Sequence, residues 1–102
     1  MARIELRDGQ WAEIRERINH AADKRIKRAY LVAERADVVE AQTVLLREFL
    51  TAWSVNDPDG YPIRLDDADA IDRMPEDIAD ILRDEANKHY GTATVPNSAT
   101  PA

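Results

Sequence analysis

Apolar residues recur at helical spacing through the middle of the chain. The clearest stretch is residues 38–53, where the apolar positions step by three and four: Val38, Ala41, Leu45, Phe49 and Ala52. Asp37 followed by Glu40 has the form of a capping box, which marks a helix start. Because no glycine or proline interrupts this stretch, the pattern predicts a central helix over 38–53 with one buried face.

Two weaker helical patterns precede this segment. Asp8 is placed to cap a helix whose apolar stripe comprises Trp11, Ile14 and Ile18. Residues 24–35 repeat the pattern less cleanly, and Asn19-His20 separates the two segments as a stop. Before Gly9, polar and apolar residues alternate, and Ile4 and Leu6 share one face. This alternation predicts a short N-terminal strand that needs a partner.

Turn residues dominate the region after Trp53. Pro58-Asp59-Gly60 predicts a tight turn, across which Val55 and Ile63 can pair as a small β-hairpin. Asp66, Asp67 and Asp69 predict the start of a short helix.

Pro75 suits the first position of a last helix, and Gly91 is a natural stop. The expected fold is mostly α: about four helices, a short N-terminal strand and a small β-hairpin. Residues 1–90 form a single helical domain. Residues 91–102 are small, polar and punctuated by proline, and we expect a flexible C-terminal tail.

Composition removes several kinds of chemistry. The 102 residues include no cysteine and two histidines, so a disulfide framework, a thiolate metal site or a His-rich site cannot be built. The run Asn56 to Gly60 departs from a calcium loop, because aligning its glycine places Val55 at the first ligand position and Asp66 at the twelfth. With no serine elbow or glycine-rich loop, we expect no enzyme activity and no cofactor or metal. No apolar run is long enough to span a membrane, which favours a soluble intracellular protein.

Charge is unevenly distributed along the chain. Residues 1–36 carry nine Lys or Arg and six Asp or Glu, whereas residues 37–102 carry five and fourteen. The basic residues cluster at Lys24, Arg25, Lys27 and Arg28. This cluster is either a solvated helix face or a surface for an acidic partner. The acidic remainder argues against nucleic acid, and the two halves can attract each other within one chain or between copies.

Trp11 and Trp53 lie on stripes of helical spacing, which favours a place in the core. A tryptophan that is exposed instead becomes the leading candidate for a binding hot spot.

The order of these features resembles the small tail assembly chaperones of long-tailed bacteriophages. The resemblance covers about residues 3–90. Its elements are a charged strand, a central helix ending in Trp53-Ser54, an Asn-Asp-Pro-Asp-Gly turn and the step Met74-Pro75-Glu76-Asp77 before a last amphipathic helix.

The resemblance implies a protein that binds the tape-measure protein, keeps it soluble and helps the tail-tube protein assemble around it in the host cytoplasm. The expected partner-binding surface is the exposed side of the 38–53 helix together with Lys24, Arg25, Lys27, Arg28, Trp11 and Trp53. We expect no membrane partner, and a homo-oligomer stays open. The alternatives are a small structural tail or connector protein of the virion and, behind it, a nucleic-acid-binding regulator.

Overall fold

The computed structural model describes residues 1–32 and 38–94 of the chain. Its elements follow in the order β1 (Ala2–Glu5), the short 3-10 helix η1 (Arg7–Gly9), β2 (Trp11–Ile14), α1 (His20–Val32), α2 (Val38–Phe49), β3 (Leu50–Trp53), α3 (Ala70–Arg73) and α4 (Glu76–Thr94). Over these residues the fold is therefore α+β, with four α-helices and a three-stranded antiparallel sheet, and the expectation of a mostly α domain is wrong.

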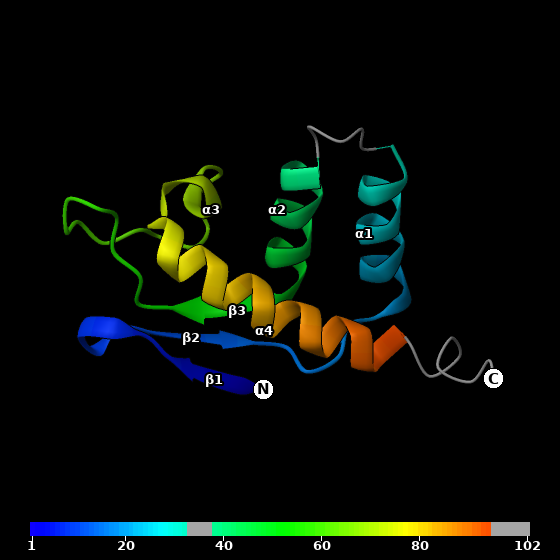
Figure 1. Ribbon diagram of the computed structural model, residues 1–102, viewed down its shortest axis with the longest axis horizontal. Coiled ribbons are helices and arrows are strands. Elements are labelled where there is room, and N and C mark those ends of the chain that lie inside the picture. Colours follow the sequence, from blue (N-terminus) through cyan, green and yellow to red (C-terminus); the bar gives the residue numbers. More distant parts are fainter. Residues whose placement is uncertain (33–37, 95–102) are drawn as a thin grey trace.

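The sheet has the strand order β1-β2-β3 (Figure 1). In the β1–β2 ladder Ile4 lies opposite Ala12, and in the β2–β3 ladder Ala12 lies opposite Trp53. The predicted N-terminal strand thus finds its partner in β2. The β2–β3 register shifts at Glu13/Ile14, and β3 comes from a segment almost forty residues downstream.

The helix expected from Asp8 onward is replaced by a β-hairpin. Asp8 and Gly9 both have positive φ, 56° and 75°, and the Gln10 amide donates to the Arg7 carbonyl at 3.0 Å. Two left-handed residues in succession are typical of a type I′ turn, whose twist matches paired strands. Asp8-Gly9 is therefore the turn between β1 and β2 and not a helix cap.

The central helix is shorter than predicted. α2 begins at Val38, as the capping pattern predicts, although Asp37 itself lies outside the described residues. It ends at Phe49, and the chain continues directly into β3. Phe49, the last residue of α2, and Leu50, the first residue of β3, are both buried. The apolar pattern in the sequence therefore shows no break where the helix ends and the strand begins.

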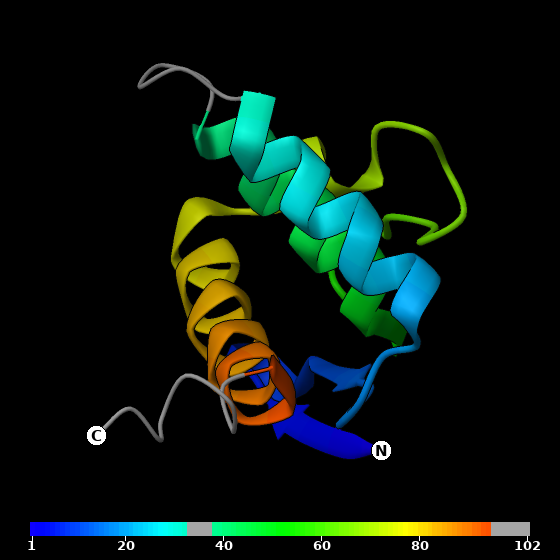
Figure 2. The same ribbon diagram turned by 90° about the vertical axis from the view of Figure 1, so that its right-hand side faces the viewer.

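α2 lies at the centre of the helical layer, in contact with α1, α3 and α4. α1 and α2 stand side by side, while α4 runs across the sheet (Figures 1 and 2). The core joins both layers in one cluster, which includes Ile14 of β2, Ile26 of α1, Leu45 and Phe49 of α2, and Ile78 and Leu82 of α4. Each of these six side chains is fully buried.

The remaining boundaries follow local signals. Asn19 caps α1, since its Oδ1 accepts from the Ala22 amide at 2.9 Å. Pro75, predicted at the first position of the last helix, lies one residue before α4, and Gly91 does not end this helix, which continues to Thr94. Of the tail expected at 91–102, residues 91–94 are therefore helical, and 95–102 lie outside the described residues.

The turn at Pro58-Asp59-Gly60 forms as predicted. The Gly60 amide donates to the Asp57 carbonyl at 2.9 Å, and Gly60 has a φ of 90°. The Ile63 amide donates to the Val55 carbonyl at 3.0 Å beside an isolated bridge between Asn56 and Pro62. Val55 and Ile63 thus share one backbone hydrogen bond, but the described chain has no strand at either residue, and the predicted β-hairpin is reduced to this bond and the neighbouring bridge.

Candidate protein-binding surface

The basic cluster lies on α1, and its four cations differ in whether they have a partner within the described chain. Ile26, at the centre of the cluster, is fully buried against the core, and Lys24, Arg25, Lys27 and Arg28 are exposed around it. Two of these cations pair within the chain.

Arg25 joins α1 to the end of α2. Its Nε and Nη2 atoms donate to the two carboxylate oxygens of Glu48 at 2.8 and 2.7 Å. The hydrogen bonds and charge of Glu48 raise the pKa of the Arg25 guanidinium. This two-point contact fixes the side chain, and it joins the basic first part of the sequence to the acidic remainder within one chain.

Lys27 is paired through Asp23. Its Nζ lies 3.0 Å from Asp23 Oδ2, while the Tyr90 hydroxyl donates to Asp23 Oδ1 at 2.9 Å. Burial alone would raise the pKa of Asp23, but the hydrogen bonds from Lys27 and Tyr90 outweigh it and hold that pKa below its ordinary value. Burial, followed by the bond to Asp23, raises the pKa of Tyr90 to about 12.

Lys24 and Arg28 have no hydrogen bond or ion pair to any side chain in residues 1–32 and 38–94. Positions 24, 28 and 31 share one face of a helix, and Leu31 is 86% exposed. We call Lys24, Arg28 and Leu31 the α1 stripe. It combines two uncompensated cations with an apolar side chain that nothing in the described chain covers.

A second basic feature lies beside the N-terminus of α1. A hollow of about 370 Å³ is lined by residues that include Arg15, Asn19, Arg25, Arg47 and Glu48. Arg47 donates to the Ala68 carbonyl, and Arg25 is held by Glu48, whereas the exposed Arg15 has no side-chain partner among the described residues. The hollow therefore has an excess of positive charge.

Sequence reasoning did not single out Arg15 or Arg47, because the hollow joins β2, α1 and α2. The signal available in the sequence was the excess of basic residues before residue 37.

The two tryptophans occupy different environments, and both are half-buried. Trp53 packs against the core, and its Nε1 donates to the Ile63 carbonyl at 2.9 Å. Trp11 lies on the other face of the sheet, where the Arg3 guanidinium carbon stands 4.5 Å from its ring centroid. The interpretation of Trp11 as a residue on the stripe of Ile14 is wrong, because successive residues of a strand face opposite sides and these two are three positions apart in β2.

The exposed side of the central helix offers little surface. α2 packs against three other helices, and among its described side chains only Glu40 and Arg47 are exposed. The partner-binding face expected on α2 is limited to these two exposed side chains in the described part of the helix, and it stays a prediction.

The Asp57 side chain in the acidic turn at residues 57–60 accepts hydrogen bonds from nearby backbone amides. Asp57 Oδ1 accepts from the amides of Asp59 and Tyr61 at 2.9 and 3.0 Å. Over residues 1–32 and 38–94, no three His, Asp or Glu side chains are grouped to hold a metal ion. The same ranges contain no helix that is both long and apolar enough to cross a bilayer.

No protein-family model, curated protein or solved structure matches this chain. What the structure defines is a small α+β domain with a basic, partly apolar outer face on α1.

Proposed function

We propose that this protein binds another protein chain and acts as a tail assembly chaperone of a long-tailed bacteriophage, with the tape-measure protein as its client. The α1 stripe is the observation that carries the binding part of the proposal. Lys24 and Arg28 carry charge without a described partner, and Leu31 is 86% exposed. The resemblance in the sequence supplies the identity of the client.

The α1 stripe suits a helical client with acidic and apolar residues on one face. Covering Leu31 removes apolar surface from water and contributes about 2 kcal/mol when complete. Lys24 and Arg28 select acidic side chains and increase the association rate more than the affinity. One such contact is weak and reversible, as a chaperone requires. Many copies along a long client supply the total affinity.

In this proposal the protein acts by covering apolar surface of the client and does not catalyse a reaction. A tape-measure protein without its tube exposes long apolar seams that favour aggregation. Chaperones bound along these seams keep it soluble in the host cytoplasm until the tail-tube protein replaces them. The proposal requires no cofactor, metal, nucleic acid or membrane.

The decisive experiment is co-expression with the long helical tail protein encoded beside this chain. We expect the wild-type protein to keep that client soluble and to co-purify with it. The Lys24→Glu/Arg28→Glu variant should lose the client while keeping its melting temperature, because neither side chain has an intramolecular partner in the described chain. The matched control is Arg64→Glu/Lys88→Glu, which makes the same change of charge at exposed positions away from α1.

Three results count against the proposal. A client that aggregates beside soluble wild-type protein removes the chaperone role. Equal loss of the client in both double variants shows that net charge, and not the α1 stripe, governs binding. Mass spectrometry of purified phage particles tests the alternative, since a chaperone is absent from them and a structural virion protein is present.

A further inference from the structure

β1 is the edge strand of the sheet, and one of its two sides has no partner strand in the described chain. β1 pairs with β2 on one side, and no described strand pairs with its other side (Figure 1). The Leu6 amide donates to the Gln10 carbonyl at 2.8 Å, so Leu6 and Gln10 form a hydrogen-bonded pair. Along an antiparallel ladder, hydrogen-bonded pairs alternate with pairs that are not hydrogen-bonded. Ile4 is therefore bonded to β2, and the backbone groups of Arg3 and Glu5 point away from the sheet.

The hydrogen bonds between β2 and β3 show the same thing, namely that the backbone groups of Glu5 point away from β2. The Ser54 amide donates to the Trp11 carbonyl at 2.9 Å, so the backbone groups of Trp11 point toward β3. Glu5, which lies opposite Trp11, consequently receives no bond from β2. Two amides and two carbonyls, those of Arg3 and Glu5, have no backbone partner along this edge among residues 1–32 and 38–94.

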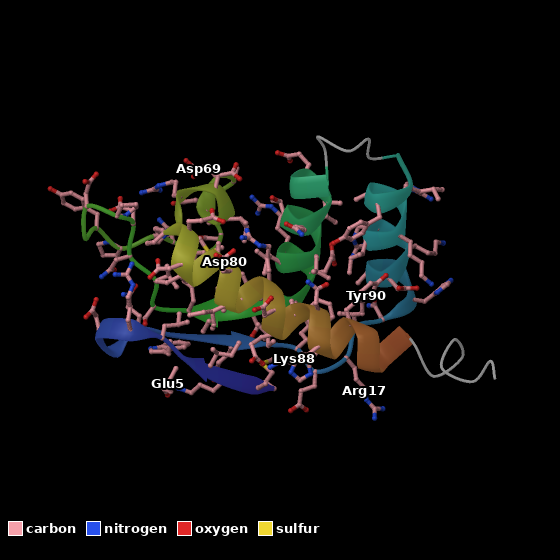
Figure 3. The ribbon with its side chains drawn as sticks, viewed as in Figure 1. Glu5, Arg17, Asp69, Asp80, Lys88 and Tyr90 are labelled. Carbon is pink, nitrogen blue, oxygen red and sulfur yellow. The ribbon has the colours of Figure 1, made fainter. Side chains whose placement is uncertain are left out.

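The side chains of β1 divide between two faces. Arg3 and Glu5 are exposed on the outer face, where they form an ion pair of 3.1 Å; Glu5 is labelled in Figure 3. Ala2, Ile4 and Leu6 pack against the core but are only partly buried. An additional strand at this edge would cover the apolar side chains and bond the free backbone groups.

We propose that the occupant of this edge is β1 of a second copy, paired antiparallel across a two-fold axis so that two sheets become one of six strands. In the register centred on Ile4, Arg3 of each protomer lies opposite Glu5 of its partner. The residues with free backbone groups then face each other, which allows four backbone hydrogen bonds. Ile4 meets Ile4 on the core side.

The charges select this register over its neighbours. A shift by two residues in one direction places Arg3 opposite Arg3, and a shift in the other direction places Glu5 opposite Glu5. Like charges directly opposite each other destabilise a sheet, whereas opposite charges stabilise it. The sequence Ala-Arg-Ile-Glu-Leu of residues 2–6 is thus self-complementary in charge and in apolar pattern.

The contact is short, so the dimer is weak and depends on concentration. Sedimentation of the wild-type protein up to about 1 mM should show a reversible monomer–dimer equilibrium. Arg3→Glu places Glu opposite Glu twice, and Glu5→Arg places Arg opposite Arg twice. Each change should raise the dissociation constant about tenfold or more. The swap Arg3→Glu/Glu5→Arg should restore dimerisation.

Mixing gives a test that does not depend on the stability of any one variant. The Arg3→Glu and Glu5→Arg proteins should form a heterodimer when mixed, because every cross-strand pair is then of opposite charge. Native mass spectrometry distinguishes it from either homodimer. Glu40→Arg, the same change of charge at an exposed position on α2, is the control and should leave dimerisation unchanged.

A further variant removes a backbone group. Glu5→Pro deletes an amide that points away from β2, so it should abolish the dimer and leave the hairpin folded. A wild-type protein that stays monomeric at the highest concentration overturns the proposal. So does a dimer that both single reversals leave intact. The proposal is independent of the chaperone function, because none of these measurements involves the client.

Discussion

The Tyr90 hydroxyl and the Asp23 carboxylate join the last helix to the first across 67 positions of sequence, at 2.9 Å. The Tyr90 ring also packs edge-on against Phe49, with centroids 6.1 Å apart and planes at 81°. One side chain of α4 therefore contacts α1 by a hydrogen bond and α2 by its ring. These contacts help hold α1, and with it the α1 stripe, in place.

Removing the hydroxyl alone should weaken the fold modestly. Tyr90→Phe keeps the ring against Phe49 but leaves Asp23 with Lys27 as its remaining side-chain partner. A hydrogen bond to a carboxylate contributes more than a neutral one, and partial exposure reduces that gain, so we expect a loss of about 1 kcal/mol in the free energy of unfolding. Urea titration followed by circular dichroism measures it. An unchanged midpoint would show that the bond contributes nothing.

The same bond predicts alkaline sensitivity. The pKa of Tyr90 is raised to about 12 in the folded protein, from 10.0 in the unfolded chain. The resulting stabilisation is complete below pH 10 and disappears as the pH rises toward 12. Thermal unfolding between pH 9 and 12 should show this loss in the wild type. In Tyr90→Phe the loss should be smaller, and parallel curves for the two proteins would contradict the assignment.

Neighbouring cations on α1 should respond differently to charge reversal. Arg25→Glu replaces a two-point contact with repulsion against Glu48 and should lower the melting temperature. Lys24→Glu has no described partner to lose and should stay close to the wild type, within about 0.5 kcal/mol as is usual at exposed sites. Differential scanning calorimetry of the pair makes the comparison. Equal effects would mean that the Glu48 contact does not stabilise α1.

A substitution at Leu31 should change client binding without changing the stability of the fold. Leu31→Glu should leave the melting temperature nearly unchanged, because the side chain is 86% exposed, and should reduce recovery of the client in co-expression. Tyr61→Glu is a suitable control, since Tyr61 is 68% exposed on the turn region away from α1. If both variants retain the client equally, the apolar part of the α1 stripe has no role in binding.

The junction between α2 and β3 should be sensitive to core truncation. Phe49 is fully buried where the helix becomes a strand and contacts Tyr90. Phe49→Ala should cost about 3–5 kcal/mol through lost burial and the cavity left behind, a large part of the stability of a domain this size. Chemical denaturation checks the value. A cost below about 1 kcal/mol would indicate that the site is looser than the packing shows.

Local sequence signals determined much of the element order. Asn19 as a boundary, the start of α2, the turn ending at Gly60 and Pro75 before the last helix all depend on residues within a few positions of each other. Capping and turn geometry are settled by such neighbours. Asp8-Gly9 is an equally local turn signal, but Asp8 was interpreted as a helix cap and no turn was predicted there.

The alternation of Arg3-Ile4-Glu5-Leu6 predicted a strand, but its partner and the strand at 50–53 could not be obtained from local pattern. Four residues such as Trp11–Ile14 fit both a helical and an extended period, and the choice depends on pairing with Leu50–Trp53. The basic cluster was visible in the sequence as four adjacent cations. The pairing of Lys27 with Asp23, one helical turn earlier, is local to α1, whereas only the tertiary structure placed Glu48 of α2 beside Arg25. Lys24 and Arg28 are left facing outward without a described partner: charge in a sequence is a property of residues, whereas available charge depends on what the fold places beside them.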